Sequence, residues 1–338
     1  MPDTREPAPR EPVSERAGFR LAAFGALLVV VLFAGYGIGR LNDSVERAAA
    51  APVPPPAATT GGGHGHDAAP AGAVSPSPHD DTGAPPHVHN ADGTVTDVAG
   101  GPPAAETVGG LAVTASGLTL APEKTAFQAG KRQPFSFRIM AAGAPVTTYA
   151  VVHDKPLHLV VVRRDLSGFQ HLHPVMAPDG TWGIDLTLAA PGSYRAVADF
   201  TAIVGGRKTP VTLGVDLTVA GDYTPVALPA PATKATTDGF TVSYAGRPRT
   251  GVSEPLLMTV TGPGGAPAAL EPYLGAFGHL VVFREGDVGY VHVHPEPRLV
   301  DGAVRFWLTA PGPGRYRMFF DFQVAGRVHT AAFTAVVS

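Results

Sequence analysis

The sequence predicts an all-β protein, with two tandem immunoglobulin-like β-sandwich domains after an N-terminal transmembrane helix and a disordered linker. Three observations support this fold class. From about residue 108 onward, short apolar or alternating runs are separated by Gly and Pro turns, as is typical of β-sandwiches. The second half of this region repeats the first, as in His158-Leu-Val-Val and His279-Leu-Val-Val. No long segment after the N-terminal apolar run has the 3.6-residue period of a helix.

The first element is an uncharged, mostly apolar run over residues 21–39, about 28 Å long as a helix and so close to the thickness of one bilayer core. Four Arg precede it, and only two basic residues follow before Lys124. This asymmetry predicts a cytoplasmic segment 1–20 and a single-pass plasma-membrane protein with extracellular C-terminal domains. A signal peptide cleaved near the small residues 48–51 is the alternative.

The second element, residues 40–107, is predicted to be a disordered linker. It is dominated by Ala, Pro, Gly, Thr and His and has few large apolar side chains, so it cannot bury enough surface to offset chain entropy. It also contains a scattered set of histidines that could gather metal loosely. These are His64, His66, His79, His87 and His89.

The repeat sets the bounds of the two sandwich domains at 108–222 and 223–338. One recurring element is Pro-Gly-x-Tyr after a strand, which ends at Tyr194 in the first repeat and at Tyr316 in the second. It resembles the E–F corner of immunoglobulin-like sandwiches, where a Tyr near the start of strand F fixes the turn.

A candidate metal site occurs once in each repeat, as a His followed after twelve residues by His-x-His-Pro. The histidines are His158, His171 and His173 in the first repeat and His279, His292 and His294 in the second. Two His at i and i+2 on a strand share a face. Hairpins closing at 164–167 and at Gly286-Asp287 place His158 opposite His173 and His279 opposite His294, with Cβ atoms about 4.5–5.5 Å apart. We therefore expect one three-imidazole metal site in each domain.

Other polar residues could complete these sites. His153 in the first domain and His329 in the second are candidate fourth ligands, and Asp199 and Asp321 could orient a ligand His. All-nitrogen ligation suits Cu(II) or Zn(II), favours Ni(II) less, and disfavours Ca and Mg. Copper comes first, with zinc closely after it, because secreted His-rich proteins without thiols fit Cu(II) handling. Imidazoles that only pack at a sandwich edge, satisfied by backbone carbonyls, are the structural alternative.

Composition excludes several classes of protein. The chain has no Cys, which rules out disulfides, thiolate metal sites and Cys nucleophiles. A net charge of −3 without a basic patch makes nucleic acid an improbable partner. No nucleophile elbow, His-Glu-x-x-His helix or paired-carboxylate constellation occurs, so we expect no enzyme, and a metal-dependent hydrolase is the least favoured function.

These observations predict a membrane-anchored extracytoplasmic protein that binds Cu(II) or Zn(II) through its His clusters, for sequestration or delivery. Its partners would be the membrane, through the N-terminal helix, and possible envelope proteins. The alternative is a metal-free envelope module for protein–protein interaction.

Residues 153–201 resemble a group of membrane-anchored actinobacterial proteins of unknown function. That group is built around the His-Leu-His-Pro hairpin, here ending at Pro174, and a Tyr-Arg-x-x-x-Asp-Phe strand, here starting at Tyr194. The resemblance implies topology and fold rather than an activity. A looser similarity to the CopC and YtkA/FixH kinds of copper-associated sandwiches favours copper without locating a ligand.

Overall fold

The computed structural model describes residues 87–89, 95–97 and 108–338. The predicted transmembrane helix 21–39 and most of the predicted linker lie outside the described residues. No helix in the described part of the chain is long and apolar enough to cross a membrane. Within the linker, β1 (His87–His89) and β2 (Val95–Asp97) pair as antiparallel strands. Their β-branched residues favour extended backbone, so this part of the linker is more regular than we expected.

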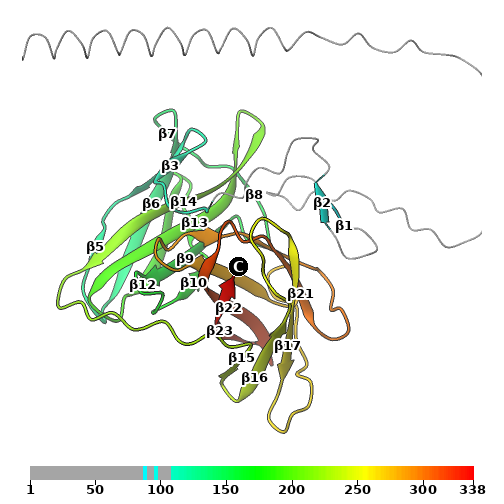
Figure 1. The fold of residues 1–338 in the computed structure, drawn as a ribbon. Helices are drawn as coiled ribbons and strands as arrows, with labels where there is room; N and C mark the ends of the chain where they lie inside the picture. Colours follow the sequence, from blue (N-terminus) through cyan, green and yellow to red (C-terminus); the bar gives the residue numbers. More distant parts are fainter. Residues whose placement is uncertain (1–86, 90–94, 98–107) are drawn as a thin grey trace, which may run out of the picture. The chain divides into compact units, whose positions relative to one another are not determined.

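The first sandwich consists of two six-stranded sheets, drawn mainly in green in Figure 1. One sheet has the order β10 (Gln170–Leu172), β9 (Leu157–Arg163), β13 (Gly192–Val204), β14 (Arg207–Val219) and β5 (Ala126–Phe127), with β8 (Tyr149–Ala150) also paired to β13. The other has the order β11 (Val175–Met176), β12 (Thr181–Thr187), β6 (Arg132–Ala141), β4 (Leu118–Pro122) and β3 (Thr114–Ala115), with β7 (Ala144–Pro145) paired to β6.

The second sandwich repeats this plan with a five-stranded and a four-stranded sheet, in yellow to red (Figure 1). The five-stranded order is β15 (Lys234–Thr237), β16 (Phe240–Ala245), β17 (Glu254–Thr261), β21 (Val304–Leu308) and β20 (Val293–Pro295). The four-stranded order is β19 (Tyr290–Val291), β18 (His279–Arg284), β22 (Gly314–Val324) and β23 (Arg327–Val337). The all-β prediction is confirmed for the described residues.

A third apolar core joins the two sandwiches, in addition to the core inside each of them. On β9, Leu159 and Val161 face the first sandwich's own core, whereas Val160 and Val162 face the second sandwich. The residues of the shared core include Val197, Val281, Phe283, Tyr290 and Phe319. The sheets that contain β9 and β18 therefore lie between two cores each, and their outer faces are buried against one another.

The predicted strand register is confirmed, but the pairing of each His-x-His strand with its neighbour ends before the last His. His171 lies opposite Val160 on β9, and Val291 lies opposite Val282 on β18, as expected. β10 then ends at Leu172. In the second repeat, β20 joins the other sheet, where His294 pairs with Trp307. The prediction that His294 lies opposite His279 is therefore wrong, because the strand crosses between sheets with Val291 and Val293 still in the core.

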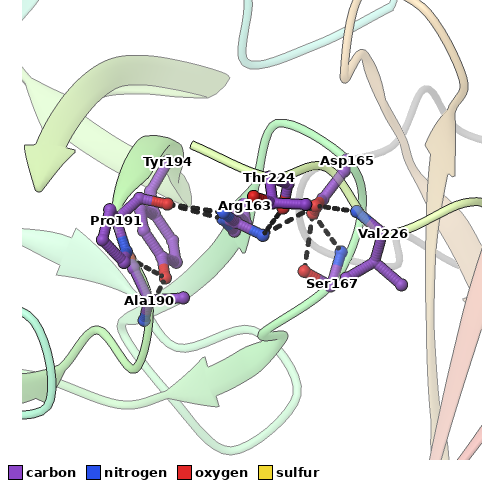
Figure 2. Close-up of polar contacts among 8 residues, drawn as sticks. All are labelled: Arg163, Asp165, Ser167, Ala190, Pro191, Tyr194, Thr224 and Val226. Carbon is purple, nitrogen blue, oxygen red and sulfur yellow. Dashed lines mark hydrogen bonds and ion pairs between the residues drawn. The ribbon is translucent and has the colours of Figure 1, made fainter. Parts of the chain in front are cut away.

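Both predicted tyrosine corners are present. The Tyr194 hydroxyl donates to the carbonyl of Ala190 at 2.8 Å, and the Tyr316 hydroxyl donates to the carbonyl of Gly312 at 2.7 Å. Figure 2 shows the first corner beside the buried Arg163, whose guanidinium donates to the carbonyl of Pro191.

The same arginine holds the chain segment that leads from one sandwich to the next. Arg163 donates to the carbonyl of Thr224 at 3.2 Å and to the carboxylate of Asp165 at 2.8 Å (Figure 2). Asp165 in turn accepts the backbone N–H of Val226 at 2.8 Å. Because the paired side chains of Arg163 and Asp165 are each only 5% exposed, this clamp fixes the connecting segment against the first sandwich.

Candidate functional site

The central histidines of the two repeats meet at the interface between the sandwiches. His158 lies on the same face of β9 as Val160, and His279 lies on the same face of β18 as Val281. Both valines face the shared core. The two histidines are 4% and 6% exposed, and their ring centroids lie 5.2 Å apart. The repeats therefore contribute to one common cluster, which differs from the expected separate site in each domain.

Three histidines of this cluster could bind one ion. His158, His171 and His279 each offer a ring nitrogen, and these three atoms all lie within 4.8 Å of one another. Nδ1 of His158 is 3.1 Å from Nε2 of His171. Nitrogens bound to one metal at about 2.0–2.1 Å are separated by a similar distance, so the observed spacing suits a shared ion.

The hydrogen bonds of two rings show where their lone pairs point. Nε2 of His158 lies 3.1 Å from the carbonyl of Val152, which can only accept, so this nitrogen donates. Nδ1 of His171 lies 2.8 Å from the carboxylate of Asp321 and donates to it. In the neutral rings, the remaining lone pairs face each other between Nδ1 of His158 and Nε2 of His171. Such an arrangement is stabilised by a cation, either a metal ion or a proton.

Two reciprocal His–Asp pairs connect the sandwiches. His171 of the first repeat pairs with Asp321 of the second, and His292 of the second pairs with Asp199 of the first, at 2.8 and 3.1 Å. Asp199 lies directly opposite His158 across the strand ladder, and Asp321 lies directly opposite His279. The sequence predicted that these aspartates could orient a ligand His, but it did not indicate that they would do so across the domain interface.

The aspartates are themselves held in place by threonines on the next strand. Thr212 donates to Asp199 at 2.8 Å, and Thr330 donates to Asp321 at 2.6 Å. Each carboxylate thus accepts a threonine hydroxyl and an imidazole N–H, and its direction is fixed before any ion binds.

The two halves of the cluster are not equivalent. The side chain of His171 is 2% exposed, whereas that of His292 is 36% exposed. In addition, Tyr290 donates to Asp199 at 3.2 Å, but its counterpart in the first repeat, Phe169, stacks on Phe319 instead. The three-histidine group therefore forms around His171 rather than around His292.

The remaining candidate ligands fall in different places. The ring of His173 lies 5.1 Å from that of His158 and 4.9 Å from that of His171. The ring of His153 lies farther out, at 6.1 Å from His158 and 5.6 Å from His279. His329 lies outside this cluster, because its Nδ1 bonds to Asp238 at 2.7 Å and its ring packs on Phe240 and Phe322.

Burial favours the uncharged form of His158, His173 and His279. Desolvation, with the nearby His171, lowers the pKa of His158 to about 4 and that of His173 to about 3, and it holds the pKa of His279 well below its ordinary value. Burial alone would raise the pKa of Asp199, but His292 and Thr212 outweigh it and hold that pKa below the usual range. At neutral pH the rings of His158, His173 and His279 are therefore in the form that binds metal ions.

A model of a protein family described as a domain of unknown function, DUF8832, matches residues 112–218 and again residues 235–338. The chain belongs to this family. The two matched segments contain the main strands of the two sandwiches. No curated protein matches the chain.

Several solved structures show distant likeness. FdeC, an adhesin of Escherichia coli, is 15% identical to this chain, with a TM-score of 0.23. The match covers 67% of this chain and 66% of the FdeC chain, which is just under two thirds of the FdeC chain. The D0-D1 domain of intimin is 11% identical over 64% and 96%, with a TM-score of 0.20. A putative membrane-anchored protein from Corynebacterium diphtheriae is 10% identical over 66% and 59%, with a TM-score of 0.21. Likeness at this level does not bear on function.

Proposed function

We propose that this protein is a membrane-anchored, extracytoplasmic metal-binding protein. It holds one Cu(II) or Zn(II) ion at the histidine cluster between its two sandwiches, for sequestration or delivery. The observation that carries this proposal is the group of three ring nitrogens, from His158, His171 and His279, within 4.8 Å of one another. The apolar run 21–39 and the Arg-rich segment before it support the membrane anchor and the extracytoplasmic location.

The chemistry of the cluster fits this function. Neutral imidazoles are good ligands for Cu(II) and Zn(II), and the low pKa values of His158 and His173 keep them neutral well below pH 7. Asp321 fixes the ring of His171 through the nitrogen that does not face the cluster, which is how metal-binding histidines are commonly oriented. We assign no enzymatic activity to the site.

The test is metal content and calorimetric titration of the full-length protein in detergent, without a polyhistidine tag. The wild type is compared with His171→Ala, so the linker histidines, which are present in both, cancel in the difference. We expect the wild type to bind one more equivalent of Cu(II) or Zn(II) than the variant.

The matched control is His329→Ala. It also removes a buried histidine that is paired with an aspartate, but one outside the cluster. This control should retain the extra equivalent. Equal metal uptake by the wild type and His171→Ala would refute the proposal.

The second candidate function is a metal-free envelope module that binds a protein partner. The observation that favours it is that the shared apolar core and the two His–Asp pairs already join the sandwiches without an ion. In that case the cluster is a structural fastening, and adding Cu(II) or Zn(II) to the stripped protein will leave its unfolding temperature unchanged.

A further inference from the structure

We infer that the ion is a dication and that His173 closes its coordination set as a fourth imidazole, so that no position is left for water. This inference rests on the proposed function and specifies it, because a closed site holds an ion, whereas a site with an open position can activate water on it.

The ring positions support a four-imidazole set. Rings that bind one tetrahedral ion at about 2.0–2.1 Å have their centroids roughly 5 Å apart. Among His158, His171, His173 and His279, five of the six ring pairs have centroids 4.7–5.4 Å apart. His173 is close to His158 and His171, whereas the ring nitrogens that all lie within 4.8 Å of one another belong to His158, His171 and His279, so His173 must move toward His279 to complete the set. These four rings come from three strand regions in two sandwiches, so the spacing is not a consequence of one local turn.

Unsatisfied nitrogens also point to an ion. Nε2 of His173 and Nδ1 of His279 are buried and have no hydrogen-bond partner within the described part of the chain. Buried polar atoms without a partner are uncommon and costly in folded proteins. One ion bound by both atoms, together with the facing nitrogens of His158 and His171, removes both of these unsatisfied groups.

His153 is the other candidate for the fourth ligand, and the geometry disfavours it. Its ring lies 6.1 Å from His158 and 5.6 Å from His279, farther than any of the five ring pairs above. We therefore assign His153 to the surroundings of the ion and not to its ligands.

The charges near the cluster favour a dication. The four imidazoles are neutral donors, and no thiolate is available because the chain lacks Cys. Hard or borderline divalent ions such as Zn(II) and Cu(II) prefer such nitrogen donors, whereas Cu(I) prefers sulfur. The carboxylates of Asp199 and Asp321 lie opposite His158 and His279 on their ladders, so two negative charges are available to balance a charge of +2.

The test uses Co(II) as a spectroscopic probe in the full-length, untagged protein. The visible spectrum of His171→Ala is subtracted, which removes the contribution of Co(II) bound to the linker. We expect the intense absorption of tetrahedral Co(II), which azide does not change because no ligand position is open.

The decisive variant is His173→Ala. It should bind Co(II) at least tenfold more weakly and acquire an azide-sensitive spectrum, because removing the fourth imidazole opens a position. His153→Ala should behave like the wild type. If His173→Ala does not fold, X-ray absorption of the wild-type Zn(II) protein decides instead, with four imidazole nitrogens expected.

The outcomes separate this inference from the proposed function. An azide-sensitive wild-type spectrum, or a His173→Ala variant that binds Co(II) like the wild type, overturns the closed set while leaving metal binding intact. A zinc shell of three imidazoles and one oxygen ligand overturns it as well. If the wild type takes up no more Co(II), Zn(II) or Cu(II) than His171→Ala, the proposed function fails together with this inference.

Discussion

At the scale of single residues, the cluster depends on how Asp321 holds His171. The carboxylate is 3% exposed and accepts hydrogen bonds from His171 and from Thr330. This fixes which nitrogen of His171 carries the proton and leaves the other directed at His158. In the proposed metal site, Asp321 would therefore position the ligand His171 without contacting the ion.

Replacing Asp321 by Asn should therefore weaken metal binding without abolishing it. The amide keeps the size of the side chain but removes the charge that polarises and orients His171, and we expect about a 10–100-fold loss in affinity. Competition with a chelator of known affinity measures it. Asp238→Asn, which removes the equivalent partner of His329, is the control and should bind metal normally. Equal affinities for the two variants would contradict the role of Asp321.

The buried histidines also predict how stability depends on pH. The pKa of His158 is lowered from 6.5 to about 4 in the folded protein. Between these values the unfolded chain binds a proton that the folded chain does not, so the metal-free protein loses stability as pH falls from 6.5 toward 4. The loss is on the order of 1.4 kcal/mol per pH unit for this residue. Urea unfolding of stripped protein at pH 7 and pH 5 measures it, and His158→Gln should show a smaller loss.

At the scale of elements, part of the site was predictable from β9 and β18. The hairpin loops predicted the register, in which His171 lies opposite Val160. A register shifted by one residue would have placed His171 and Val160 on different faces of the sheet. The run from Leu157 to Val162 is apolar at every position except His158, a pattern typical of strands buried on both sides. That pattern could have indicated a second buried face before the structure was known.

The interface itself was not predictable from the sequence. Docking of the two sheets depends on side chains such as Val197 and Phe319, which in a single sequence look the same as ordinary core residues. The spacing of the histidines was therefore consistent with two separate sites. The transfer of His294 to the other sheet depends on tertiary packing and left no local signal.

Because the shared core brings the ligand histidines together, we expect metal affinity to depend also on core residues that are distant in sequence from those histidines. The ring of Phe319 stacks on that of Phe169 across the interface, with the ring centroids 4.0 Å apart, and Phe319 is 5% exposed. Phe319→Ala should reduce the free energy of unfolding by about 3–5 kcal/mol and also weaken metal binding, because it loosens the docking that brings His279 to His171.

The control is Phe127→Ala in the first sandwich's own core, which is equally buried. It should be destabilised comparably in urea but bind metal with wild-type affinity when folded. If both variants lose affinity to the same extent, the interface does not control the site.

At the scale of the whole molecule, the described sandwiches form one structural unit. The third core and the reciprocal His–Asp pairs both oppose their separation. The clamp of Arg163 and Asp165 holds the connecting segment against the first sandwich. An ion bound by His158, His171 and His279 would add a direct bond between the two repeats. The two repeats are similar in sequence, but they contribute unequally to a single site, with two histidines from the first repeat and one from the second.

This arrangement predicts that metal stabilises both sandwiches together. At a free concentration one hundred times the Kd, one bound ion adds about 2.7 kcal/mol to the free energy of unfolding. Calorimetry should show a single unfolding transition that shifts to higher temperature with Zn(II) in the wild type and does not shift in His171→Ala. Two transitions, of which only one responds to Zn(II), would show that the site belongs to one domain.

The most direct test of the shared site is a crystal structure of the Zn(II)- or Cu(II)-loaded protein with anomalous diffraction at the metal edge. We predict one strong anomalous peak per chain in the sandwich region, about 2.0–2.1 Å from ring nitrogens of His158, His171 and His279. Two peaks, each bound only by histidines of its own repeat, or no peak at this interface, would contradict the account.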